Sequence, residues 1–271
     1  MDGRHGTSFD AGSIWSTPAD APTYPRFPIP FRDCTVLSLQ YRTDPGAIAA
    51  ILPAPLEPTG DTVLVQIGRW GDVPGLGRDL FECNVMVGAA LRAHGRDVRG
   101  SYSPYFYLDS DRAIALGREV QGQPKRLARI TLEDRGDLHV GVVETNGIDV
   151  ATGTLPYKWR RADISEVRAR VDVGTNINLK VIPHVDGRSA VRQLVVRDIV
   201  ELEVSECWTG PCTVELRPNA VAPIHRLPVL EHLDGFYWRA SFALAGGSVL
   251  YEYPADPGDA PSMRSSAAKP G

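Results

Sequence analysis

A mainly β fold is predicted by the sequence, with antiparallel sheets arranged as a barrel or as paired sheets and with few, short helices. Apolar and polar residues alternate over short runs such as VELEVS (200–205) and CTVEL (212–216). This period of two is typical of half-buried strands. Proline and glycine separate the runs and helical patterns are rare, so strands should make up most of the core.

The individual elements follow from these patterns along the chain. An Asp-Pro pair before AIAAIL (47–52), with a proline directly after it, predicts a short capped helix, and DSDRAIALG (109–117) predicts another. A Gly-Pro pair separates the two alternating runs, so we expect a hairpin over residues 200–216. Further strands are expected at residues 63–67, 85–90, 138–144, 192–196 and 248–253.

The two ends of the chain differ in composition from its middle. Residues 1–26 and 255–271 are rich in Pro, Gly and Ser, so we expect a flexible N-terminal segment and a disordered C-terminal tail. The chain has 271 residues, of which 43% are hydrophobic, and this is enough to bury a sizeable core. We expect a single domain over residues 27–254.

Charge and hydropathy exclude several partners. The net charge of -4 gives no long-range attraction for nucleic acid or for anionic lipid. No apolar run approaches the ~20 residues of a membrane helix and the first residues lack an apolar signal stretch, so we expect a cytoplasmic protein without membrane contact. Neither the histidines nor the cysteines (Cys34, Cys83, Cys207 and Cys212) have the spacing of a metal site. We therefore expect no metal and reduced cysteines.

Lysine is rare in this chain. Of the 29 basic residues, only Lys125, Lys158, Lys180 and Lys269 are lysines. A guanidinium keeps its proton in proteins whereas an ammonium can lose one, so a reaction that needs a neutral amine must use one of these four. The alternative to an enzyme is a binding protein, in which a barrel encloses a small acid without changing it chemically.

Lys125 directly follows the second predicted helix, in the segment GREVQGQPKRLA (117–128). Gly122 and Pro124 in this segment can fix the direction of a side chain. To be neutral near pH 7, a lysine needs a pKa about three units below ~10.4, through burial or a nearby cation. An apolar wall and the adjacent Arg126 could supply these, but two solvated charges on a loop would show the same spacing.

The segment 117–128 resembles the active-site segment of acetoacetate decarboxylases, in which G-R-E is followed by P-K-K and the first lysine forms a Schiff base. The resemblance spans about residues 27–253, and it implies antiparallel sheets closed into a cone or barrel and a homo-oligomer. Other segments are similar to the family in the family's order: YRTDPGAIAAILPAPLE (41–57), YFYLDSDRAIALGRE (105–119), LKVIPHVDG (179–187), CWTGP (207–211) and APIHRLPV (222–229).

The resemblance implies roles for particular residues. Lys125 corresponds to the Schiff-base lysine, and Arg126 keeps the positive charge of the lysine that follows it. Glu82, in GLGRDLFEC (75–83), corresponds to a pocket glutamate that acts as acid or base. Tyr251 is a further candidate, because a phenol near an iminium can relay a proton. A surface salt bridge for Glu82 and a core position for Tyr251 are the alternatives.

Two positions depart from the decarboxylases of the family. Gln66 takes the place of a second pocket glutamate and Cys34 that of an arginine, although a shift of two residues would bring Arg32 there instead. In the strand 63–67, Gln66 shares a face with Leu64 and can point into a cavity. In the decarboxylases, this second glutamate and the arginine help to handle the substrate carboxylate.

These features imply a Schiff-base lyase that acts on a small keto acid without a cofactor. A protonated imine at Lys125 can lose carbon dioxide or an α-proton, and either loss leaves an enamine. Because Gln66 and Cys34 replace the pair that handles the carboxylate, we predict an aldolase-dehydratase that condenses pyruvate with an aldehyde, as in non-decarboxylating members of the family. Decarboxylation of acetoacetate or another β-keto acid is the alternative, and cyclisation or dehydration of an amino-acid-derived keto acid is a third.

Overall fold

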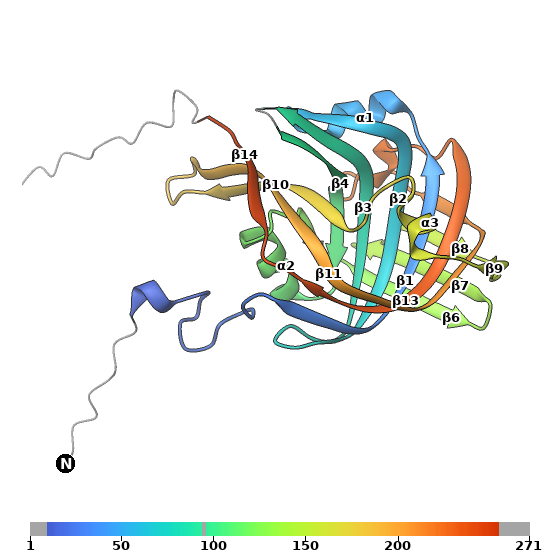
Figure 1. The fold of residues 1–271 in the computed structure, drawn as a ribbon, viewed down its shortest axis with the longest axis horizontal. Coiled ribbons are helices and arrows are strands. Elements are labelled where there is room, and N and C mark those ends of the chain that lie inside the picture. The colour runs from blue at the N-terminus through green and yellow to red at the C-terminus, as the bar shows by residue number, and fades with distance from the viewer. Residues whose placement is uncertain (1–9, 94–95, 255–271) are drawn as a thin grey trace, which may run out of the picture.

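The computed structural model describes residues 10–93 and 96–254. These residues form a large sheet that closes into a ring, a smaller sheet beside it and three short α-helices (Figure 1). The predicted mainly β fold is confirmed. The predicted C-terminal tail, 255–271, lies outside the described residues.

The ring has the strand order β10-β11-β13-β1-β2-β3-β4, and a parallel pairing of β4 with β10 closes it. Short strands extend the sheet beside β4 and β11, and β5 is parallel to β4. The bounds are β1 Ile29–Arg42, β2 Leu56–Val73, β3 Gly77–Ala93, β4 Arg96–Leu108, β5 Lys125–Leu127, β9 Arg160–Arg161, β10 Thr175–Pro183, β11 Ser189–Pro211, β13 Glu231–Leu244 and β14 Ser248–Glu252.

The small sheet packs on the outer face of the ring, and the largest hydrophobic cluster lies between the two sheets. Glycines allow the sheets to approach closely: a Cβ added at Gly141 would lie 2.5 Å from Ile67 Cδ1, and one at Gly153 would overlap Leu39 Cδ1. The strands of this sheet are β6 Arg129–Arg135, β7 Leu138–Thr145, β8 Ile148–Leu155 and β12 Thr213–Leu216.

Both predicted helices are present, as α1 (Pro45–Ile51) and α2 (Asp111–Glu119). The second begins two residues later than expected, because Ser110 caps it. Asp109 instead accepts a hydrogen bond of 2.9 Å from the backbone N–H of Phe81, which ties the end of β4 to β3. Every helix in the described part of the chain is too short or too polar to cross a bilayer.

Part of the predicted N-terminal segment packs on the domain. Tyr24 is 5% exposed, and its hydroxyl donates a 2.6 Å hydrogen bond to Glu119 at the end of α2. The limits of the flexible ends stay a prediction. Three further helical turns were not expected: η1 Ala11–Ser13, α3 Ile164–Arg168 and η2 Ile224–Arg226.

The hairpin predicted over residues 200–216 does not form. β11 pairs with β13, whereas β12 pairs with β8 in the small sheet. The alternating burial is nevertheless present in this part of β11. A period of two identifies a strand but does not choose its partner, and at Cys212 the chain passes from one sheet to the other.

Candidate active site

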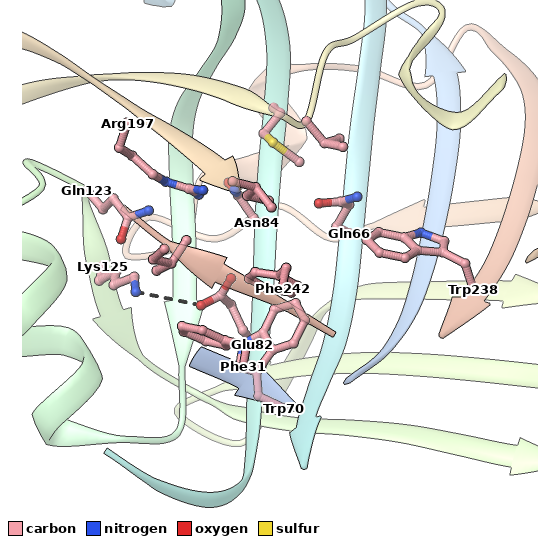
Figure 2. A pocket seen from close by; sticks show the side chains of 14 residues that line it. Phe31, Gln66, Trp70, Glu82, Asn84, Gln123, Lys125, Arg197, Trp238 and Phe242 are labelled. Atoms are coloured by element: carbon pink, nitrogen blue, oxygen red, sulfur yellow. Dashed lines mark ion pairs between the residues drawn. The ribbon is translucent and has the colours of Figure 1, made fainter. Parts of the chain in front are cut away.

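A cavity of about 50 Å³ lies inside the ring. At 10–15 Å³ for each water, this is room for a few water molecules and hence for a small organic acid. Aromatic rings form much of its wall, among them Phe31, Trp70, Trp238 and Phe242. Six polar or charged side chains also line it, and Figure 2 shows how they converge: Gln66, Glu82, Asn84, Gln123, Lys125 and Arg197.

Strands β2 and β3 supply three of these polar side chains through their alternation. Glu82 and Asn84 of β3 face the cavity, whereas Cys83 between them belongs to the core outside the ring. Gln66 of β2 faces the cavity as predicted and is the direct register partner of Asn84. The amide of Gln66 is held by a 3.0 Å hydrogen bond to Ser38 Oγ.

Lys125 enters the cavity from β5. In the parallel register with β4, Lys125 lies beside Phe106 and Arg126 beside Tyr107. The Nζ of Lys125 is 3.6 Å from Glu82 Oε2 (Figure 2). It is also 4.8 Å from the centre of the Phe106 ring. The Lys125 side chain is 7% exposed, so its amine is largely removed from water.

Helix α2 confines the stem of this lysine. A Cβ added at Gly117 would lie 2.8 Å from Lys125 Cε and closer still to its Cδ. The Gly117 carbonyl accepts a 2.9 Å hydrogen bond from the Gln123 N–H. Arg118 Nη1 donates to the Lys125 carbonyl at 3.4 Å. The G-R-E and P-K-R parts of the segment 117–128 therefore pack against each other.

The charges of the cavity shift one another's pKa values. Burial lowers the pKa of Lys125; Glu82 opposes this shift and Arg197 adds to it. Burial raises the pKa of Glu82, against the effect of both cations. Lys125 and Glu82 can therefore share a single proton, with a neutral amine beside a protonated carboxyl as one of its two arrangements.

Arg197, on β11, was not predicted as a site residue. The residue is 8% exposed, and its Nε and Nη1 have no hydrogen-bond partner among the described residues. The sequence does contain a signal for it: Arg197 is two residues before Ile199, which also lines the cavity, so it is a charged residue on the apolar face of a strand.

Two predicted pocket residues lie away from the cavity. Arg126 is exposed, and its Nη1 donates a 2.7 Å hydrogen bond to the Val221 carbonyl, because successive strand residues point to opposite faces. Tyr251 is the register partner of Leu194, which belongs to the core outside the ring. Its ring packs edge-on against Tyr253 at 5.0 Å, in the core position that was the alternative for it.

Cys34 does not line the cavity either. It is fully buried, and burial raises the pKa of its thiol to about 12. A bulge at Asp33, whose φ is 51°, leaves Phe31 as the β1 residue in the cavity wall. Arg32 is exposed and pairs with Asp72 at 3.2 Å. All four cysteines are buried and free.

Comparison with known proteins shows the family of this chain. The family model described as acetoacetate decarboxylase (ADC) matches residues 16–254. The chain belongs to the acetoacetate decarboxylase family. Acetoacetate decarboxylase 1 of Mesorhizobium japonicum is 37% identical over 242 residues, which are 89% of this chain and 96% of that protein. A structure solved in structural studies of acetoacetate decarboxylase has a TM-score of 0.82 and 33% identity, covering 89% of this chain and 96% of that one.

The prediction of an aldolase-dehydratase is wrong, because the relatives at 37% identity are named acetoacetate decarboxylases. The enduracididine biosynthesis enzyme MppR, solved with pyruvate, has a TM-score of 0.75 and 22% identity over 89% of this chain and 98% of that one, so this likeness shows the fold alone. The prediction took Cys34 as the loss of a pocket cation, whereas Arg197 places one in the cavity. The broader prediction of a lyase is confirmed.

Proposed function

We propose that this protein decarboxylates a small β-keto acid, acetoacetate or a close analogue, through an imine at Lys125. The observation that carries the proposal is the buried pair of Lys125 and Glu82, 3.6 Å apart in a cavity of about 50 Å³. The relatives named acetoacetate decarboxylases support the substrate class. A small keto acid is thus the expected partner, and the homo-oligomer and the cytoplasmic location stay predictions.

The reaction begins with attack by the neutral amine. Nζ of Lys125 adds to the ketone carbon, and a proton passes from nitrogen to oxygen to give a carbinolamine. Glu82, whose pKa is raised by burial, donates its proton to the hydroxyl group, which leaves as water. A protonated imine and an ionised Glu82 result.

Carbon dioxide then leaves the protonated imine. The bond between the α-carbon and the carboxylate carbon breaks, and its electron pair moves to the iminium nitrogen, giving a neutral enamine. A proton taken up from solvent through Glu82 adds to the α-carbon, and water hydrolyses the new imine to release the ketone and restore Lys125. The aromatic wall favours the step in which charge is lost, because it solvates a localised carboxylate poorly.

Carbon dioxide release and borohydride trapping test the proposal together. Acetoacetate with borohydride should leave a reduced adduct on Lys125, seen by mass spectrometry, and without borohydride it should yield carbon dioxide. Lys125→Ala should abolish both, whereas the control Lys158→Ala should keep both. An adduct on another lysine would refute the assignment, and saturable binding without an adduct or carbon dioxide would support the binding-barrel alternative.

A further inference from the structure

Arg197 is a buried cation to which the described part of the chain supplies no bonded counter-ion. In the described residues, its Nε and Nη1 have no hydrogen-bond partner. Glu82 is the carboxylate of the cavity, and it lies against Lys125 at 3.6 Å. A buried charge is costly unless it is paired, so an unpaired guanidinium beside a cavity is suited to an anionic ligand. Figure 2 shows the Arg197 side chain extending from β11 toward the space that Lys125 and Glu82 enter.

The net charge of the side chains that line the cavity is the same in both arrangements of the proton shared by Lys125 and Glu82. A neutral Lys125 with a protonated Glu82 sums to zero, and so does an ammonium with a carboxylate. Arg197 adds one positive charge in either case, and the other side chains that line the cavity are uncharged. One carboxylate therefore neutralises the cavity, whereas a neutral ketone leaves Arg197 unpaired.

The position of this cation differs from the expected one. The resemblance placed an arginine on β1, but Cys34 is not in the cavity wall and Arg32 is paired with Asp72 on the surface. Arg197 comes from β11, which is separated from β1 by β13. The cavity thus receives its arginine from a different strand.

We infer that Arg197 holds the substrate carboxylate and makes the site selective for keto acids over neutral ketones. This inference rests on the proposed function of Lys125. The carboxylate loses its charge as carbon dioxide forms, so the ion pair is stronger in the bound substrate than in the transition state. Such an interaction lowers KM and does not raise kcat.

Arg197→Gln tests the inference with two ligands, acetoacetate for steady-state carbon dioxide release and acetone for borohydride trapping at Lys125. The KM for acetoacetate should rise about 10- to 100-fold, as for the loss of a hydrogen bond to a charged group. The half-saturating acetone concentration should not change, and kcat should stay within about threefold of the wild type without a marked fall. Arg197→Lys should restore part of the affinity for acetoacetate.

Both ligands must be compared over a pH series, because Arg197 also lowers the pKa of Lys125. Values are taken on the plateau where Lys125 is neutral, so the change in pKa does not enter KM. The matched control is Arg126→Gln, which removes the same charge beside Lys125 in sequence but on the exposed face of β5. It should leave both ligands unaffected.

An unchanged KM for acetoacetate in Arg197→Gln overturns the inference. Equal losses for acetone and acetoacetate also overturn it, because they would mark a structural role. Thermal unfolding checks this second outcome, and the variant should melt no lower than the wild type, since it loses an unpaired buried charge. A wild-type protein that traps no ketone at Lys125 would instead refute the proposed function.

Discussion

Replacing Gly117 by Ala tests whether α2 positions the reactive amine. The added Cβ would lie 2.8 Å from Lys125 Cε, whereas carbon atoms in contact are normally about 3.5–4.0 Å apart. Because Lys125 Cδ would lie closer still, the lysine stem or the helix must move by more than about 1 Å. Ala113 and Leu116 of α2 are buried in the hydrophobic cluster that also contains Phe31 and Trp70 of the cavity wall, so we expect the lysine stem and not the helix to move.

Stability and activity should respond very differently to Gly117→Ala. Overpacking costs about 1–3 kcal/mol, and the better helix propensity of alanine offsets about 1 kcal/mol of this. The free energy of unfolding should thus fall by no more than about 2 kcal/mol. A displacement of about 1 Å at the nucleophile costs about 10²-fold in rate. Carbon dioxide release and borohydride trapping should both fall by this factor, while thermal unfolding shows a folded protein.

Gly46→Ala is the matched control. It is also a glycine in a short helix, and its added Cβ would meet Asp44 Oδ1 at 3.2 Å and no cavity residue. This variant should keep wild-type trapping and turnover. Wild-type trapping in Gly117→Ala would show that the helix does not confine the lysine, and the reasoning from close contact would fail.

Three further substitutions probe the charges around Lys125. Glu82→Gln removes the anion that raises the pKa of Lys125, so the rise of imine trapping with pH should move to lower pH. Carbon dioxide release should fall by about 10²- to 10⁴-fold, because the amide cannot act as an acid. Unchanged turnover would point to a bound water as the acid. Gln66→Glu adds an anion to the cavity and should move the same trapping profile to higher pH; a shift to lower pH would contradict the electrostatic account. Tyr251→Phe should release carbon dioxide within about twofold of the wild type, and a larger loss would return Tyr251 to the mechanism.

The strands were predictable from local alternation, but their pairing was not. The predicted strands 192–196 and 200–205 are parts of one strand, β11, which runs over Ser189–Pro211. Glu201 has a φ of 53°, and the register with β13 shifts between Val200 and Glu203. The bulge adds a residue and breaks the simple alternation, so local sequence suggests two strands where the sheet has one.

The site was predictable where its signals are local. Lys125 stands out through the scarcity of lysine and its turn segment, and Gln66 stands out as an amide on an apolar strand face. No local sequence segment marks Arg197 as a site residue in the same way. It reaches the cavity because the ring closes, and closure depends on the parallel contact of β4 with β10, which joins residues far apart in the chain.

The cation that lowers the pKa of Lys125 is not its neighbour in the sequence. Arg126 was expected to lower the pKa of Lys125 because the two are adjacent, yet a strand sends adjacent side chains to opposite faces. A cation on the cavity side of Lys125 must therefore come from another strand, and Arg197 on β11 is that cation. Burial remains the largest cause of the lowered pKa. The arginine therefore adds to a shift that the closed ring already produces, and it remains available to pair with the substrate carboxylate.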